Sequence, residues 1–173
     1  VKDNKDGTLT WHYSLNYPDQ SCLVCLIIGN YEYKSMKTAR GMPLEYWYCP
    51  DQASYFDIGY KYSVEMFSWL ENEFGMLYPW GIYKQAPVQD CPFGGMETTT
   101  STIFNENLFA DSRASLDKNY INVNVHELIH QWFGNYVLYP SSHDIWVSES
   151  FATYYAKMFE KHIFGEDRYQ YLK

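Results

Sequence analysis

The sequence has little positive charge and no long hydrophobic run. Its 13 Lys and Arg are outnumbered by 21 Asp and Glu, which gives a net charge of −8 at neutral pH. Binding to nucleic acid requires a basic surface that displaces counterions from phosphate, so we expect no nucleic-acid partner. A span across a bilayer needs about 20 apolar residues, so we expect no transmembrane segment. The longest apolar run, Cys22 to Gly29, predicts one buried strand.

Cysteine is also scarce, with four residues in the chain, at positions 22, 25, 49 and 91. Cys22 and Cys25 form a C-x-x-C pair, typical of a redox site or of half a zinc knuckle. No second pair follows at knuckle spacing, and alternation along a strand would point the two side chains to opposite faces. We therefore interpret them as structural, and the cysteines do not identify the redox compartment.

The ends of the chain carry no targeting signal. The sequence begins at Val1 without Met or a basic and apolar leader, and it stops at Lys173 inside a predicted helix. We expect a piece of a longer protein, so the compartment (cytoplasmic, periplasmic or secreted) and the oligomeric state stay open.

Aromatic residues, in contrast, are abundant: they make up 20% of the chain, and 18 of them are Tyr. Such residues line clefts for sugars or peptides, but they also fill cores and their rims. We favour the second interpretation.

Hydrophobic periodicity divides the chain into short strands followed by longer helices. The predicted strands cover 8–15, 22–31, 44–48, 82–88 and 98–104. The predicted helices cover 58–74, 119–135 and 146–164, and Gly75 and Gly165 follow two of them as stop signals.

The most informative stretch is His126-Glu127-Leu128-Ile129-His130. On a helix, residues four apart lie on the same side, so both imidazoles can reach one zinc ion. Glu127 lies about 100° around the helix from His126. This carboxylate is near the metal without being forced to bind it, and it can take a proton from the attacking water.

A catalytic zinc usually has three protein ligands and one position for water. Eighteen residues separate His130 from Glu149, which lies near the start of the next predicted helix. A helix–loop–helix of this length can bring Glu149 to the metal. The alternative is a solvated helix face, but the flanking residues are apolar and aromatic, and burying these polar groups without a partner would be costly.

The chain resembles the zinc metallopeptidases of the aminopeptidase N and leukotriene A hydrolase family. The resemblance lies in His126–Asn135, in Trp146-Val-Ser-Glu-Ser-Phe-Ala and, upstream, in Gly94-Gly-Met-Glu97, which is similar to the family's Gly-x-Met-Glu-Asn sequence. These segments occur in the family's order and span 94–152, with weaker likeness over most of the chain.

The resemblance implies one Zn²⁺ per chain, held by His126, His130 and Glu149, with Glu127 as the general base. It implies a peptide substrate with a free N-terminus. Glu97 would bind the substrate's α-amino group, and the segment before it would offer its backbone as an added strand. The implied substrate-binding residues of that segment are Gly94, Gly95 and Met96.

The resemblance also implies an α+β fold. Residues 1–34 would be the last strands of an N-terminal β-domain. Residues 35–173 would be the first lobe of a thermolysin-like catalytic domain, with a small mixed sheet packed on the metal-binding helices. The family's transition-state tyrosine would lie beyond Lys173, so we expect the isolated chain to have little or no activity.

Thr98 stands where the family has Asn, and Ser148-Glu149-Ser150 replaces its Asn-Glu-Gly. Zinc-dependent removal of N-terminal residues from peptides is the predicted function. The alternatives are leukotriene-type epoxide hydrolysis at the same zinc, and a zinc-stabilised interaction module without catalytic activity.

Overall fold

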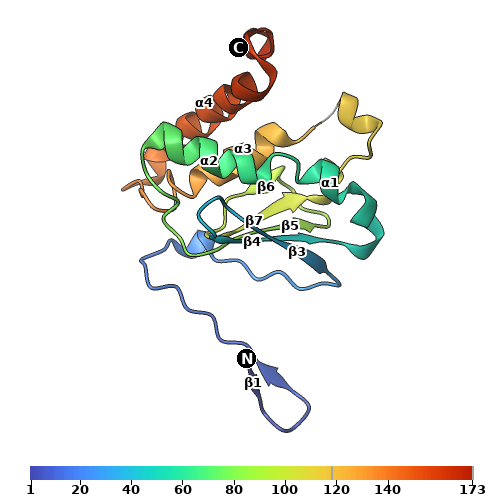
Figure 1. Cartoon of the computed structure of the whole chain (residues 1–173). Helices are drawn as coiled ribbons and strands as arrows, with labels where there is room; N and C mark the ends of the chain where they lie inside the picture. The colour runs from blue at the N-terminus through green and yellow to red at the C-terminus, as the bar shows by residue number, and fades with distance from the viewer. Residues whose placement is uncertain (118, 173) are drawn as a thin grey trace.

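The computed structural model describes residues 1–117 and 119–172 (Figure 1). Their strands are β1 (Lys2–Asp3), β2 (Leu9–Thr10), β3 (Glu32–Lys37), β4 (Pro43–Tyr48), β5 (Tyr83–Val88), β6 (Gly95–Met96) and β7 (Ser101–Asn105). Their α-helices are α1 (Phe56–Gly59), α2 (Ser63–Phe74), α3 (Ile121–His130), α4 (Ile145–Phe164) and α5 (Glu166–Leu172). Short 3-10 helices cover Ser21–Leu23, Pro50–Tyr55, Glu106–Leu108, Ala114–Leu116 and Ser142–Asp144.

Five strands form a mixed sheet in the order β3-β4-β5-β7-β6. The two central pairings, β4 with β5 and β5 with β7, are parallel, while β3 and β6 join the edges in antiparallel orientation. Helices α1, α2 and α3 lie over one face of this sheet, and α4 continues from that layer toward the C-terminus (Figure 1). The predicted α+β fold, with a mixed sheet packed against helices, is confirmed.

Aromatic side chains fill the space between the sheet and the helices. Trp132, Tyr46, Tyr83, Phe67 and Phe104 are all fully buried and belong to one core cluster. Much of the aromatic content therefore serves packing, as the sequence favoured.

The predicted helices differ from the observed ones mainly at their ends. The helix expected over 58–74 is interrupted because Tyr62 has a left-handed backbone conformation (φ 67°), and α2 then ends at Gly75 with φ 60°. The helix expected over 119–135 ends at His130. Beyond it the chain turns back on itself, with the Asn135 amide donating to the His130 carbonyl oxygen at 3.0 Å.

The N-terminal region departs most from expectation. The predicted strand over 8–15 is reduced to Leu9–Thr10, which pairs with β1 in a small hairpin that extends away from the sheet (Figure 1). The prediction of one buried strand from Cys22 to Gly29 is wrong. Leu23 is buried, but Val24, Leu26 and Ile28 are 73–85% exposed, and among the described residues no strand pairs with this segment.

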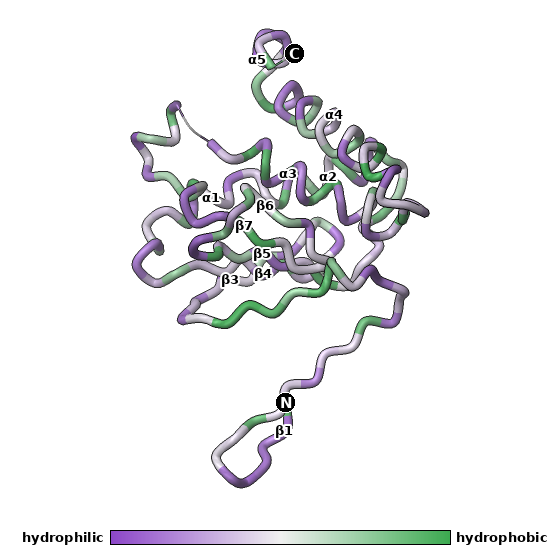
Figure 2. The backbone as a smooth tube through the Cα atoms, turned by 180° about the vertical axis from the view of Figure 1, so that it is seen from behind, coloured by the Kyte–Doolittle hydropathy of each residue, from purple (hydrophilic) through white to green (hydrophobic). Residues whose placement is uncertain are grey.

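This segment forms the hydrophobic stretch that precedes β3 in Figure 2. Cys22 and Cys25 are exposed free thiols, so the alternation expected of them in a buried strand is absent. The domain boundary predicted near residue 34 falls within β3.

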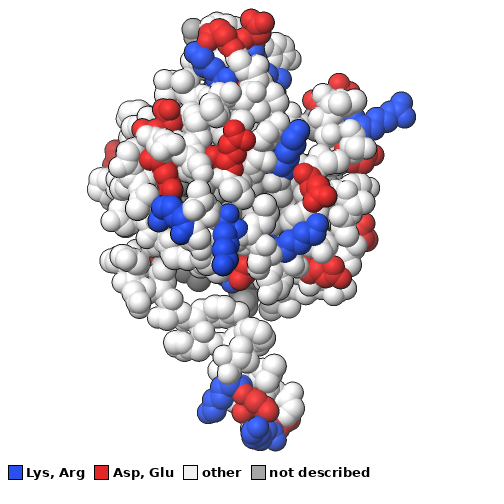
Figure 3. Space-filling view, in the orientation of Figure 1, with Lys and Arg blue, Asp and Glu red and all other residues white. Residues whose placement is uncertain are grey.

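The surface carries both signs of charge. On the face shown in Figure 3, basic and acidic side chains are interspersed. Among the described residues, no helix combines the length and the apolar character needed to cross a bilayer.

Candidate metal centre

Three side chains converge at the C-terminal end of α3 and the start of α4. The Nε2 atoms of His126 and His130 lie 3.1 Å apart, and the Glu149 carboxylate oxygens lie 3.4 Å from the first and 3.5 Å from the second. Two nitrogens bound at 2.0–2.1 Å to a tetrahedral metal would be separated by about 3.3 Å, close to the observed separation of the two Nε2 atoms. One ligand atom from each of the three residues lies within 4.8 Å of the others. His126, His130 and Glu149 therefore form a group that can hold a metal ion.

The packing of α4 on α3 explains how Glu149 reaches the histidines. Ala152 and Ala156 follow Glu149 at helical spacing and are fully buried. Their small side chains allow the two helices to approach closely. Phe151 stacks on Phe133 with ring centroids 4.5 Å apart and planes 8° apart, which anchors the start of α4. The predicted third ligand is thus placed by ordinary helix packing.

His130 is held in one orientation by the turn that follows α3. Its ring is 1% exposed, and its Nδ1 lies 3.0 Å from the Phe133 carbonyl oxygen. Because a carbonyl can only accept, Nδ1 carries a proton, and Nε2 is the ring nitrogen that faces His126 and Glu149. The bond to the backbone carbonyl therefore leaves Nε2 as the nitrogen that is available to a metal ion.

The charges around the three ligands favour a cation. Hydrogen bonds to His126 and His130 lower the pKa of Glu149. Burial lowers the pKa of His130, but the hydrogen bond to Glu149 and the charges of Glu97 and Glu127 outweigh it and raise this pKa to about 9. Three carboxylates thus stabilise positive charge at this point of the fold.

Glu127 lies on the inner side of the same helix, 6% exposed. Burial raises its pKa to about 8, the neighbouring His130 opposes this, and Glu97 and Glu149 raise it further. A carboxylate whose pKa is raised by burial binds a proton more readily than an exposed one, which suits the predicted general base.

Gly95 allows the edge strand to approach Glu127. A Cβ atom at position 95 would lie 2.5 Å from Glu127 Oε1, so a side chain there could not be accommodated without a shift. Gly94 has more room, since its nearest neighbour would be Val123 Cγ1 at 4.0 Å. The close approach to Glu127 therefore requires glycine at position 95 but not at position 94, a difference that the sequence pattern does not show.

The segment around Glu97 forms the edge of the sheet beside the metal ligands. Gly95 and Met96 make up β6, which pairs with β7 at the end of the strand order, and Glu97 follows directly. The Glu97 carboxylate is near enough to raise the pKa of both Glu127 and His130. An edge strand next to the metal ligands can accept an extended peptide as a further strand.

Sequence reasoning missed the two amides that hold this segment. Gln131 and Asn135 are buried, and both donate hydrogen bonds to the Glu97 carbonyl oxygen, at 3.0 and 2.6 Å. Their signal in the sequence is weak. They are polar residues among the aromatic residues that follow His130, a position that does not reveal which backbone group they contact.

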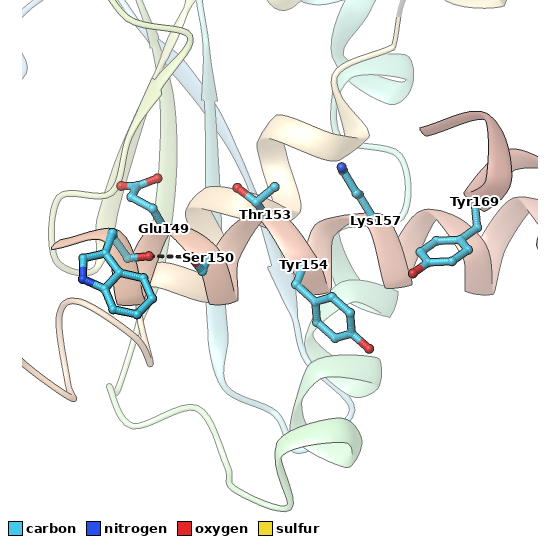
Figure 4. A pocket seen from close by; sticks show the side chains of 7 residues that line it. Glu149, Ser150, Thr153, Tyr154, Lys157 and Tyr169 are labelled. Carbon is cyan, nitrogen blue, oxygen red and sulfur yellow. Dashed lines mark hydrogen bonds between the residues drawn. The ribbon is translucent and has the colours of Figure 1, made fainter. Parts of the chain in front are cut away.

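A groove of about 480 Å³ runs along α4 from Glu149 toward α5 (Figure 4). Its lining includes Trp146, Glu149, Thr153, Lys157 and Tyr169. Glu149 thus lies both beside the two histidines and on the lining of this groove.

Comparison with known proteins agrees with this geometry. Residues 58–172, two thirds of the chain, match the Peptidase family M1 domain. Endoplasmic reticulum aminopeptidase 1 of Homo sapiens is 28% identical over 153 residues, covering 86% of this chain and 16% of that protein. Glutamyl aminopeptidase of Bos taurus is 29% identical over 147 residues, covering 83% and 15%.

Aminopeptidase A of Gloydius brevicauda is similarly 29% identical over 150 residues, covering 84% of this chain and 16% of its own length. The chain thus spans about 16% of the length of the curated relatives that it matches. With the family match extending from α1 through α5 and including every predicted metal ligand, the chain belongs to peptidase family M1.

Proposed function

We propose that this chain is the metal-binding part of a zinc aminopeptidase, which removes N-terminal residues from peptides. The observation that carries the proposal is the meeting of His126, His130 and Glu149 beside a buried acid, Glu127. Two imidazoles and one carboxylate are the ligand set of hydrolytic zinc sites. The names of the relatives, all aminopeptidases, support the same activity.

The residues of the site have two roles, metal binding and proton transfer. His126, His130 and Glu149 would hold the zinc, which when bound supplies Lewis acidity toward the scissile carbonyl and the attacking water. Glu127 would accept the proton of that water and pass it to the nitrogen of the leaving amine. Its position next to His126 on α3 and its 6% exposure place this carboxyl group beside the metal site, where it can serve both transfers.

Glu97 would select substrates with a free N-terminus. Its negative charge, next to the metal ligands, pairs with a cationic α-amine and places the first peptide bond at the metal. Gly94, Gly95 and Met96 would offer the backbone of β6 to the peptide. In this assignment residues 35–173 belong to the first lobe of a thermolysin-like catalytic domain and residues 1–34 to the end of a β-domain.

Two other functions use the same metal. Epoxide hydrolysis needs a lipid-shaped pocket, whereas the groove along α4 contains the charged side chain of Lys157. An interaction module without catalytic activity needs no buried acid beside its metal, yet Glu127 is 6% exposed. Both observations favour peptide hydrolysis.

Glu127→Gln tests the proposal. We expect the variant to keep its zinc, measured by metal analysis, and to lose turnover of an aminoacyl reporter by about a hundredfold or more, the usual contribution of a general base. Turnover is assayed on a longer protein that contains this chain, because the isolated chain is expected to have little or no activity. Turnover equal to that of the parent would show that Glu127 is not the base.

A further inference from the structure

The side chain of Gln131 spans the gap between the end of α3 and the turn that follows β6. Its Nε2 donates to the carbonyl oxygens of Glu97, at 3.0 Å, and Thr98, at 3.3 Å, and its Oε1 accepts from the Thr100 amide at 2.8 Å. Its own backbone carbonyl accepts from Trp80 Nε1 at 3.0 Å. Every polar group of this fully buried side chain is therefore used to hold one turn.

Asn135, in the turn that follows α3, makes a second bond to this segment. Its Nδ2 donates to the Glu97 carbonyl oxygen at 2.6 Å, while its backbone amide donates to the His130 carbonyl at 3.0 Å. One residue is thus bonded both to the backbone of a metal ligand and to the backbone of Glu97. Asn135 Oδ1 finds no partner among the described residues, so its amide is used only in part.

The sheet holds the far end of this turn but not its beginning. At the far end, the Lys84 amide of β5 donates to the Thr100 carbonyl oxygen at 2.8 Å. At the beginning, the ladder of β6 with β7 ends at Met96, one residue before Glu97. Thr100 has a left-handed backbone conformation (φ 64°), which a β-branched residue adopts only when its surroundings impose it, and here the Lys84 amide and the Gln131 side chain bond its backbone. At Glu97, the amides of Gln131 and Asn135 bond the backbone where the ladder has ended.

We propose that Gln131 and Asn135 are positioning residues for Glu97. By bonding its carbonyl oxygen to the helix that bears His126 and His130, they set the place of the Glu97 carboxylate relative to the metal. This inference rests on the proposed role of Glu97 as the group that binds the substrate's α-amine. Displacements of about 1 Å at a binding group are enough to weaken productive placement, so the two amides act on substrate selection without touching substrate.

The test separates amine recognition from metal binding. Leucine hydroxamate binds zinc through its hydroxamate and carries a free α-amine, whereas N-acetyl-leucine hydroxamate has the same zinc-binding group without the cation. The ratio of their affinities for the zinc-loaded chain, measured by titration calorimetry, reports the contact with Glu97. We expect the parent chain to prefer the free amine and Glu97→Gln to lose that preference.

Gln131→Met keeps the size of the side chain and removes its hydrogen bonds. We expect it to lower the preference for the free amine at least about tenfold, with zinc content and affinity for the acetylated probe unchanged, because only the position of Glu97 moves. Asn135→Leu should lower the preference for the free amine less. This variant replaces Gln131→Met as the test if Gln131→Met does not fold. Gln85→Met is the matched control: Gln85 is an equally buried amide, bonded to Tyr83 and Asn124, and should keep the parent's preference.

Amide exchange gives a second readout that does not depend on the role of Glu97. Exchange of the Thr100 amide should accelerate in Gln131→Met and stay slow in Gln85→Met. If both Gln131→Met and Asn135→Leu keep the parent's preference, or if Gln85→Met loses it equally, the positioning inference is wrong. If Glu97→Gln keeps the preference, the proposed role of Glu97 is wrong, and the inference falls with it.

Discussion

The candidate metal centre and the N-terminal arm, residues 22–29, contain similar apolar residues that differ in burial. Around the centre, apolar residues of α3 such as Val125, Leu128 and Ile129 are at most 1% exposed. In the arm, Val24, Leu26 and Ile28 form an equally apolar series and are largely exposed. The difference shows that a hydrophobic pattern states which side chains suit burial, whereas a packing partner decides whether burial occurs.

The largest effect should follow from removing a metal ligand. His130→Ala leaves one imidazole and one carboxylate, so we expect the purified chain to hold far less than one zinc ion per molecule. Metal analysis after dialysis measures it. His143→Ala removes an exposed histidine outside the cluster and should leave the zinc content at the parent level.

The next largest effect concerns the packed core around α3, which is compared below with the exposed arm. Leu128→Ala in α3 should lower the free energy of unfolding by about 2–5 kcal/mol, because it opens a cavity in a packed core. Chemical denaturation gives the value. A loss below about 0.5 kcal/mol, the range of ordinary surface substitutions, would mean that the core around α3 is loosely packed.

A smaller effect is expected at the edge strand. Gly95→Ala places a Cβ against Glu127 and should cost about 1–3 kcal/mol of stability, since the surrounding structure must shift. It should also impair turnover by displacing the base. Gly81→Ala, where an added Cβ would meet nothing within 4 Å, is the matched control and should behave like the parent in both assays.

The smallest effect should appear in the arm. Leu26→Ala removes the same atoms as Leu128→Ala but from a side chain that is 76% exposed, so stability should change by no more than about 0.5 kcal/mol. The same denaturation experiment compares the two variants. A cost approaching that of Leu128→Ala would reveal that the arm is packed in solution.

Several features of the site could be read from the sequence because they depend on local geometry. Helical spacing places His126 and His130 on one face, and α3 and α4 do form where the periodicity predicts them. The spacing to Glu149 also predicted a third ligand, and the structure brings its carboxylate within 3.5 Å of both imidazoles.

Other features depended on contacts between distant segments. The helix expected to continue to Asn135 stops at His130, where hydrogen bonds to the next turn replace those of the helix. The break between α1 and α2 follows Gly59, but the residue in the left-handed conformation is Tyr62, which the sequence does not mark. Propensity is a weak guide at such points, because tertiary packing overrides it.

The sequence by itself determined which residues are candidates for the site: two histidines on one face of a helix, the glutamate next to the first, a glutamate on the following helix, and a Gly-Gly-Met-Glu segment before them. Only the tertiary structure decided that Gly95 lies against Glu127 and that Gln131 and Asn135 hold the Glu97 carbonyl. The physical reason is the distance along the chain that separates the interacting residues. Helical spacing is set by bonds within one turn, whereas a hydrogen bond between residues 34 or 38 positions apart exists only after the sheet and helices have packed.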